Sequence, residues 1–247
     1  MDRAHRISPR RDASCAPHVN LRPAIIRADG VGRDFRDLAE TVVALRNVSF
    51  AVERGEFVAL EGPSGSGKST LLHLIAGLDV PSQGTLVVAG HDMHSLNDDQ
   101  RATLRRSTIG VVLPIVQLNP TLSLWENVAL PALLNGGRLR AGRERAEQTL
   151  KRVGLSASPD RPAGRLSSGE AQRTCVARAL FAEPALLLAD EPTSTLDSVR
   201  SDELLALLRS LADAGQTILL ATHNPRAAAY TDRSLRLLDG RLVPAPA

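Results

Sequence analysis

GPSGSGKST, Gly62–Thr70, lies directly after the apolar segment EFVALE and directly before the apolar segment LLHLIAGL. It satisfies the pattern G-x-x-x-x-G-K-[ST] in the required order of strand, loop and helix. Glycines let the backbone wrap a phosphate, and N–H groups at the start of the helix point toward it. We therefore expect a nucleoside triphosphate here, rather than a glycine-rich turn without a ligand. Lys68 would reach the β and γ phosphates, and the Ser69 hydroxyl would bind Mg²⁺. The candidate binding residues are Gly62, Pro63, Ser64, Gly65, Ser66, Gly67, Lys68, Ser69 and Thr70.

Two acidic residues, Asp190 and Glu191, follow the apolar run PALLLA. Asp190 ends a predicted buried strand, where its carboxylate can hold Mg²⁺ through water, and Glu191 can accept a proton from an attacking water or orient it. The alternative is a pair of acids that end a strand before Pro192. His223 closes the next predicted strand, TILLAT, and alone would be an ordinary strand-end residue. Because ligands of open α/β sheets bind at the carboxyl ends of the strands, we expect all three side chains near the phosphates.

The segments PALLLAD and TILLAT are continuous apolar runs, which is typical of strands buried on both faces of a parallel sheet. The helix SDELLALLRSLADAG lies between them and ends at Gly215, which favours an α/β fold. Nearer the N-terminus, ALRNVSFAV and EFVALEG flank ERG and predict a hairpin, and GTLVVAG predicts another strand.

The block between about residues 95 and 180 has mainly helical patterns and predicts a helical insertion. SLNDDQRATLRR begins with Ser95 as a predicted N-cap, and SLWENVALPALL follows it. RERAEQTLKRVGL places Ala146, Leu150 and Val153 on one face, which we expect to be buried.

A second predicted anion site lies in RLSSGEAQRTCVARALFAEP. Ser167 and Glu170 form the capping-box pattern S-x-x-E, and the helix that they open is predicted to run to about Glu183. A well-capped helix is the simplest interpretation, but a Ser-Ser-Gly segment at a helix N-terminus also suits an anion. One chain cannot easily fold this site and Gly62–Thr70 onto one phosphate. Two chains arranged head to tail could, each lending its capped helix to the ATP of the other.

Composition limits the class of protein. The chain has 247 residues, 43% apolar content and a net charge of +3, which fits one large domain or a domain with a subdomain. Residues 1–22 carry several arginines without apolar periodicity and predict a flexible basic tail rather than a secretory signal. A nucleic-acid-binding arm is the alternative for this tail, but neither a basic stripe nor an aromatic platform follows, and we expect no nucleic-acid partner.

The cysteines and the lengths of the apolar runs indicate the cellular compartment in which we expect the protein. Cys15 falls in the predicted tail and Cys175 in a predicted helix, which indicates a reducing cytosol and no structural disulfide. No apolar run of the sequence approaches the roughly 20 residues of a membrane-spanning helix. If the protein serves a membrane process, we expect another chain to supply the membrane part.

In their order and approximate spacing these motifs resemble those of the ATP-binding subunits of ABC transporters. The Walker A loop at Gly62–Ser69, the signature-like LSSGE at Leu166–Glu170, the Walker B segment ending in Asp190 and Glu191, the D-loop STLD and the switch His223 carry the resemblance. It covers about residues 24 to 243. TLSLWENVALP, LLHLIAGLD and LADEPTSTLD are most similar to the subgroup that partners permeases of the lipoprotein-release and macrolide-export type.

The resemblance implies a fold and a set of partners. The fold is an α/β P-loop NTPase core of the ABC ATPase type, with an antiparallel β subdomain and an inserted helical subdomain. The implied domain spans residues 23–243, with the helical subdomain at about 95–180 and a tail at 244–247. The implied partners are a second copy of the chain, in an ATP-dependent homodimer, and integral membrane permease subunits that hold the protein at the cytoplasmic face of the cell membrane.

The resemblance also implies roles for single residues in an ATPase that uses ATP and Mg²⁺. The catalytic residues would be Lys68, Glu191 and His223, and the metal ligands Ser69 and Asp190. The signature residues Ser167, Ser168, Gly169 and Glu170 would bind the ATP of the opposite subunit, and Ser194 and Asp197 belong to the D-loop. Phe35 matches the aromatic position that stacks on adenine, with a simple hydrophobic anchor as the alternative.

Two departures from the family pattern stand out. Ser168 replaces the first of two signature glycines, which keeps the backbone N–H but not the freedom of φ. In IGVVLPIVQL, a predicted buried strand stops pairing at about Leu113, because Pro114 cannot donate to a sheet. Pro114 also falls where the family has its Q-loop glutamine, which contacts Mg²⁺ and the attacking water and relays closure to the permease. Gln117 would take that part only in a remodelled loop.

The departures leave alternatives to an active transport ATPase. A nucleotide-binding regulatory or partner subunit that hydrolyses slowly is the first, because Pro114 offers neither a side-chain oxygen nor an N–H. Lys68, Glu191 and His223 favour the active enzyme. An ABC ATPase acting on DNA or ribosomes is the second, but the sequence has no long coiled-coil insertion or second cassette.

Overall fold

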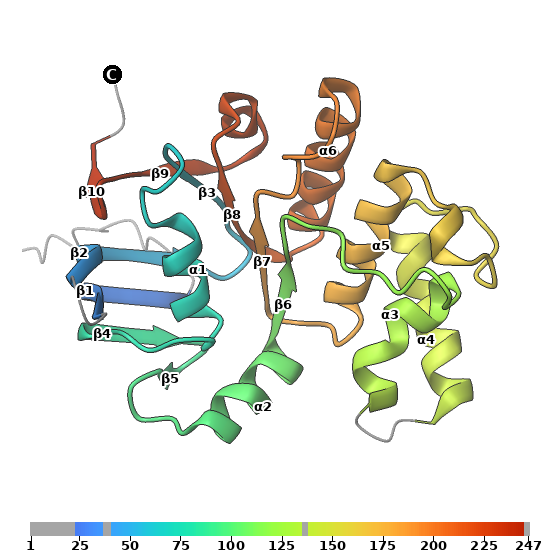
Figure 1. Cartoon of the computed structure of the whole chain (residues 1–247), viewed down its shortest axis with the longest axis horizontal. Helices are drawn as coiled ribbons and strands as arrows, with labels where there is room; N and C mark the ends of the chain where they lie inside the picture. The colour runs from blue at the N-terminus through green and yellow to red at the C-terminus, as the bar shows by residue number, and fades with distance from the viewer. Residues whose placement is uncertain (1–22, 37–40, 135–137, 245–247) are drawn as a thin grey trace, which may run out of the picture.

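The structure, a computed structural model, describes residues 23–36, 41–134 and 138–244. Two β-sheets form the frame, and helices lie between and beside them (Figure 1). The predicted tail at residues 1–22, with Cys15, lies outside the described residues, as does most of the tail predicted at 244–247.

The larger sheet has six strands and confirms the predicted parallel core. In spatial order they are β10 (Arg241–Val243), β9 (Arg233–Leu238), β3 (Phe57–Glu61), β8 (Thr217–Thr222), β7 (Leu186–Asp190) and β6 (Ile109–Val112). The strands β9, β3, β8, β7 and β6 run parallel to their neighbours, and β10 pairs antiparallel with β9. All residues of β7 and β8 are buried, as their continuous apolar runs predict.

The smaller sheet has four antiparallel strands and corrects one prediction. In spatial order they are β2 (Thr41–Glu53), β1 (Ala24–Arg36), β4 (Gln83–Val88) and β5 (His91–Asp92). The hairpin predicted across ERG is wrong, because β2 pairs with β1 while β3 pairs with β8 and β9 of the other sheet. The turn between Glu53 and Glu56 exists, with a Glu56 N–H to Glu53 carbonyl bond of 3.2 Å, but it leads from one sheet to the other.

Six α-helices are described, and their boundaries correct two further predictions. They are α1 (Lys68–Ile75), α2 (Asp98–Thr108), α3 (Leu124–Leu134), α4 (Leu139–Arg152), α5 (Ser168–Leu180) and α6 (Ser198–Asp213), with 3-10 turns at Ala163–Arg165 and Pro225–Tyr230. The N-cap of α2 is Asn97, not Ser95, because Asn97 and Gln100 form a complete capping box and the Ser95 hydroxyl donates to the Asp92 carbonyl. Helix α5 ends at Leu180, earlier than predicted, since Glu183 before Pro184 has a left-handed φ of 50°.

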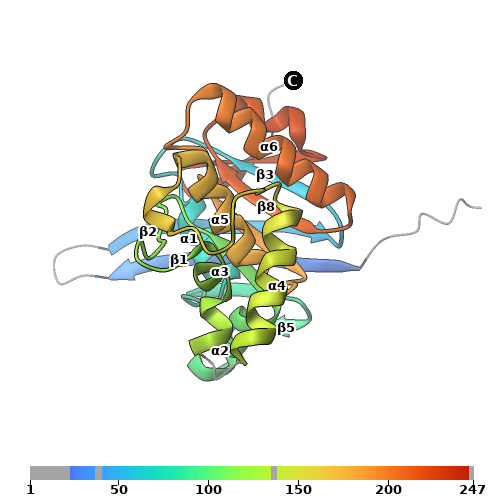
Figure 2. The same ribbon diagram turned by 90° about the vertical axis from the view of Figure 1, so that its right-hand side faces the viewer.

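The helices divide the molecule into layers. Helix α1 lies between the two sheets, and α3, α4 and α5 gather at the end of the molecule away from the antiparallel sheet (Figures 1 and 2). The buried face predicted for α4 is confirmed, because Ala146, Leu150 and Val153 are at most 3% exposed. The block predicted as helical, residues 95–180, also contains β6, which joins the six-stranded sheet. None of the helices in the described part of the chain is both long and apolar enough to cross a membrane.

Two apolar clusters cover the two faces of the six-stranded sheet. One contains Leu188, Leu219 and α1 residues, together with inward side chains of the antiparallel sheet. The other contains Leu187, Leu220 and side chains of α3 to α6. Neighbouring residues of each central strand therefore point into different clusters, as the period of two requires. This frame brings the carboxyl ends of β3, β8 and β7 to one edge of the sheet.

Candidate functional site

The segment Gly62–Thr70 follows β3 and includes the first turn of α1, as the predicted order of strand, loop and helix requires. Gly67 is the N-cap of α1 and has a φ of 103°, and a Cβ there would stand 2.7 Å from the Ala44 carbonyl oxygen. Only glycine fits this position without strain. Gly67 offers no side-chain cap, so the first N–H groups of α1 remain available to an anion.

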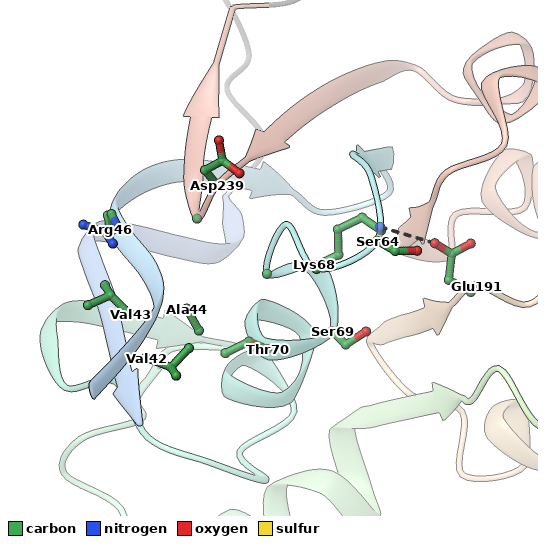
Figure 3. A pocket seen from close by; sticks show the side chains of 13 residues that line it. Val42, Val43, Ala44, Arg46, Ser64, Lys68, Ser69, Thr70, Glu191 and Asp239 are labelled. Atoms are coloured by element: carbon green, nitrogen blue, oxygen red, sulfur yellow. Dashed lines mark ion pairs between the residues drawn. The ribbon is translucent and has the colours of Figure 1, made fainter. Parts of the chain in front are cut away.

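Lys68 is the first residue of α1 and follows the loop directly. Its ammonium donates to the carbonyl oxygens of Gly62 and Pro63, at 2.8 and 3.0 Å, and stands 3.4 Å from Glu191 Oε1. The Lys68 side chain is 7% exposed, so its charge is largely removed from solvent and paired with a carboxylate. Figure 3 shows this ion pair across the cavity.

Glu191 joins Lys68 to His223. Glu191 Oε2 is 2.8 Å from His223 Nδ1 and accepts a 3.3 Å bond from the His223 peptide N–H. The bond to the carboxylate places the proton of a neutral imidazole on Nδ1. Glu191 itself has a left-handed φ of 44°, and its N–H donates to the Ala221 carbonyl. The predicted meeting of these groups at the ends of β7 and β8 is present.

Asp190 and Ser69 fit the chemistry of a magnesium site. Asp190 is 5% exposed, and its Oδ1 atom has no hydrogen-bond partner among the described residues. Burial raises the pKa of the Asp190 carboxyl, while a hydrogen bond with Ser69 acts in the opposite direction. A buried carboxylate oxygen without a partner, beside a hydroxyl, suits a hard cation.

A cavity of about 490 Å³ extends from this loop to the antiparallel sheet (Figure 3). It is lined by Val42, Val43, Ala44, Arg46, Ser64, Gly65, Gly67, Lys68, Ser69, Thr70, Glu191, Asp239 and Gly240. Phe35 is absent from this lining and 42% exposed, but it pairs across the sheet with Val42.

Sequence reasoning missed the contribution of the turn between β9 and β10. The Gly240 N–H donates to the Ser66 carbonyl at 3.0 Å, and the Gly240 carbonyl accepts from the Arg46 N–H at 2.7 Å. The dipeptide Asp239-Gly240 is a turn signal that predicts a hairpin. Nothing in it indicates the contact with the phosphate loop.

The signature residues lie at the start of α5, and the predicted capping box is confirmed. Ser167 Oγ accepts from the Glu170 N–H at 3.3 Å, and Glu170 Oε2 accepts from the Ser167 N–H at 2.9 Å. That backbone bond, above all, lowers the pKa of Glu170. Ser168 is the first helical residue and has a negative φ, so it presents its N–H as glycine would. None of Ser167, Ser168, Gly169 and Glu170 lines the cavity of Figure 3.

The D-loop residues connect Glu191 to the signature. The Ser194 N–H donates to the Glu191 carbonyl at 3.1 Å, and Asp197 caps α6 by accepting from the Arg200 N–H at 2.9 Å. The Arg200 guanidinium then contacts Asp197 Oδ2 at 3.1 Å and Ser168 Oγ at 3.4 Å. Sequence reasoning did not single out Arg200, because no motif marks it.

Residues 113–118, here called the Pro114 loop, follow β6, which ends at Val112 as the proline predicts. Pro114 is half-buried and Gln117 is exposed. Neither lines the cavity. The Gln117 carbonyl accepts a bond of 2.5 Å from Arg178 of α5.

Comparisons with known proteins identify the family of the chain. A family model described as ABC transporter matches residues 45–194. The lipoprotein-releasing system ATP-binding protein LolD of Gluconobacter oxydans (strain 621H) is 45% identical over 227 residues, which cover 92% of this chain and 98% of LolD. The macrolide export ATP-binding/permease protein MacB of Chromobacterium violaceum is 42% identical over 218 residues, which cover 88% of this chain but 34% of MacB.

A solved structure of another ATP-binding cassette shares the fold. The ATP-binding cassette MJ0796, solved as a dimer in a post-hydrolysis state with ADP and Pi, matches with a TM-score of 0.80 and 34% identity. That match covers 89% of this chain and 97% of MJ0796. The predicted fold class and subgroup are thereby confirmed. The chain belongs to the ABC transporter family, as one of its ATP-binding, ATP-hydrolysing subunits.

Proposed function

We propose that two copies of the chain form a head-to-tail dimer around two ATP molecules. In this arrangement the phosphate loop of one copy and the start of α5 of the other hold the same nucleotide. One observation carries the proposal: the cavity beside Lys68 and the capped start of α5 both suit anions, yet the signature residues do not line that cavity. A second copy would supply the missing half. The structure of MJ0796 as a dimer supports dimerisation of this chain.

The proposed hydrolysis uses residues from the start of α1 and from the carboxyl ends of β7 and β8. Lys68 and the N–H groups of α1 would hold the β and γ phosphates, and Phe35 would stack on adenine beside Val42. Ser69 and Asp190 would hold Mg²⁺, which neutralises phosphate charge when bound. Glu191 would take the proton of the attacking water, with its carboxylate oriented by His223 at 2.8 Å.

The proposed partner is a separate membrane permease, in export or lipoprotein release. LolD is described as the ATP-binding protein of a lipoprotein-releasing system, and MacB as an ATP-binding/permease protein. This chain spans about a third of MacB and nearly all of LolD, which supports an ATP-binding subunit whose permease is another chain. We place the protein at the cytoplasmic face of the cell membrane, held there by that permease.

A slower nucleotide-binding partner subunit is the second candidate function. Pro114 favours it, because a proline gives the nucleotide neither a side-chain oxygen nor an N–H. The ordered Lys68, Glu191 and His223 contacts favour the active ATPase.

The substitution Glu191→Gln tests both the proposed head-to-tail dimer around ATP and the role of Glu191 as the general base. A carboxamide keeps the shape but cannot accept the proton, so ATP turnover should fall at least about 100-fold. The variant should also form an ATP-dependent dimer, measured by size-exclusion chromatography with light scattering. Unchanged turnover would exclude Glu191 as the base. If the variant loses ATP turnover but forms no ATP-dependent dimer, the proposed head-to-tail dimer is contradicted.

Glu183→Gln is the matched control. Glu183 also precedes a proline and also has a left-handed φ, 50° against 44° for Glu191. Its carboxylate pairs with Arg145 at 3.3 Å and lies outside the cavity. Turnover of the control should match that of the wild type.

A further inference from the structure

A charged side chain covers one face of the Phe35 ring. Arg33 and Phe35 stand two residues apart on β1, so their side chains project from the same face of the strand. The Arg33 Cζ atom lies 4.7 Å from the centroid of the Phe35 ring. A guanidinium this close to a ring is attracted by the negative charge of the ring face. The two side chains therefore form a cation–π pair on the antiparallel sheet.

Arg33 is itself held in place by two further residues. Its Nε atom lies 2.8 Å from Asp79 Oδ2, and its Nη1 atom donates to Ser82 Oγ at 3.4 Å. The same hydroxyl accepts from the Asp34 N–H at 3.1 Å, which fixes Ser82 to β1. The Arg33 and Asp79 side chains are 21% and 24% exposed, so solvent screens their ion pair less than one on the open surface. Because the guanidinium is anchored, it can hold the Phe35 ring rather than follow it.

Asp79 closes the segment LLHLIAGLD, whose last residue has had no role in the nucleotide site so far. It follows α1 and does not line the cavity of Figure 3. Both of its carboxylate oxygens have partners, because Oδ1 accepts from the Val80 N–H at 2.8 Å and Oδ2 faces Arg33. The carboxylate thus connects the chain after α1 to the arginine that covers the ring.

The two sides of the ring face different parts of the molecule. Strand β1 lies between β2 and β4 (Figure 1). Ser82 immediately precedes β4, and its N–H donates to the Gly32 carbonyl at 2.8 Å, so Arg33 is anchored on the β4 side. On the other side, Phe35 pairs with Val42 of β2, and Val42 lines the cavity. A base that enters from the cavity would meet the side of the ring opposite to Arg33.

We infer that Arg33 is a positioning residue for nucleotide binding, which holds the Phe35 ring in the plane on which a purine base stacks. The inference rests on the proposed role of Phe35 as the stacking partner of adenine. Guanidinium, ring and base then form three layers, with the cation and the base on opposite faces of the ring. A ring that is already oriented loses less side-chain freedom when the base binds, so the affinity for the nucleotide rises.

The affinity for ADP tests the inference, because ADP carries the base and is not hydrolysed. Arg33→Met keeps an unbranched side chain without the charge, and it should raise the Kd for ADP about fivefold in isothermal titration calorimetry. Arg33→Lys keeps a cation over the ring, and its Kd should stay within about twofold of the wild-type value. Pyrophosphate has the phosphates without the base and should bind the wild type and Arg33→Met equally. An unchanged Kd for ADP in Arg33→Met, or an equal loss of pyrophosphate binding, overturns the inference.

A double-mutant cycle separates an effect through the ring from an effect on folding. Phe35→Leu removes the ring, and in that background Arg33→Met should change the Kd for ADP less than about 1.5-fold. An equal effect of Arg33→Met with and without the ring overturns the inference and leaves the stacking of adenine on Phe35 standing. If Phe35→Leu does not weaken ADP relative to pyrophosphate, the stacking role is contradicted, and the inference falls with it.

Arg143→Met is the matched control. The Arg143 Cζ atom lies 5.5 Å from the centroid of the Trp125 ring, and Nη2 pairs with Asp160 at 2.7 Å, but Arg143 does not line the cavity. The Kd for ADP of this variant should equal that of the wild type. If Arg33→Met does not fold, Asp79→Asn replaces it, since the amide keeps the shape but removes the charge that anchors Arg33. It should also raise the Kd for ADP, and the same cycle with Phe35→Leu decides the outcome.

Discussion

Contacts with neighbouring residues fix the position of Glu191. Lys68 and His223 each contact one carboxylate oxygen, and the backbone bond to Ala221 holds the left-handed turn after β7. Sequence motifs predicted Lys68, Asp190, Glu191 and His223, because their spacing follows from phosphate and water chemistry. They did not predict the strained backbone at Glu191, which depends on the strand next to it.

Asp190→Asn should stabilise the nucleotide-free protein at neutral pH. Burial raises the pKa of Asp190 above its ordinary 3.8, so the folded state binds the proton more tightly than the unfolded state. Stability is therefore lost as the pH rises past that ordinary value and the buried carboxylate ionises. Urea unfolding at neutral and at acid pH measures the effect. The gain in unfolding free energy should shrink on acidification, and an equal gain at both pH values would refute the assignment.

Pro114→Gln should raise ATP turnover or its coupling to a permease. A glutamine amide can contact the metal and water that the proline cannot, and one such contact of about 1 kcal/mol corresponds to about fivefold in rate. Steady-state phosphate release measures turnover. Ile115→Gln, one residue further along, is the control and should leave turnover unchanged. If Pro114→Gln changes neither quantity, the loop has been rebuilt around another contact.

At the scale of elements, the sequence predicts the type of a helix cap better than the residue that forms it. Ser167 and Glu170 form the box that their spacing indicates, and Asn97 with Gln100 forms another on α2. The sequence around α2 offers Ser95 and Asn97 within three residues, and side-chain geometry decides between them. The wrongly predicted hairpin has a similar origin. The sequence of the turn at Gly55 is compatible both with a hairpin and with a turn that leads from one sheet to the other.

Ser167→Ala and Asn97→Ala should distinguish the effect of a helix cap on stability from its effect on ATP turnover. Each removes one capping box and should lower the free energy of unfolding by about 1 kcal/mol. Only Ser167→Ala should also reduce ATP turnover, because Asn97 lies outside the cavity and the signature. Urea unfolding and phosphate release measure the two effects. Equal turnover in both variants would remove Ser167 from the nucleotide site.

At the scale of the whole molecule, the parallel sheet was predictable because its central strands are continuous apolar runs. The contacts between distant segments were not. Gly240 contacts the phosphate loop through the Ser66 carbonyl, and Arg200 connects the D-loop to Ser168. No sequence pattern indicates either contact. Such contacts arise from how completed elements pack.

Leu187→Ala and Leu188→Ala test whether the two layers unfold together. These neighbours are fully buried in different apolar clusters, and each truncation should cost about 2–5 kcal/mol. Trp125, the single tryptophan, reports on the layer that contains Leu187. In a cooperative molecule, its fluorescence and the far-UV circular dichroism should shift together for both variants. An unchanged Trp125 transition in Leu188→Ala would show that the helical layer unfolds separately.

The position of β3 has a consequence for biosynthesis. This strand leads into the phosphate loop, yet its sheet neighbours β8 and β9 begin at Thr217 and Arg233. A ribosome that adds roughly 5–20 residues per second needs on the order of 10–30 s to reach them after β3 has emerged. During that interval the nascent chain carries every residue of the loop but lacks both neighbouring strands of β3. We therefore expect nucleotide binding only after β8 and β9 have been synthesised.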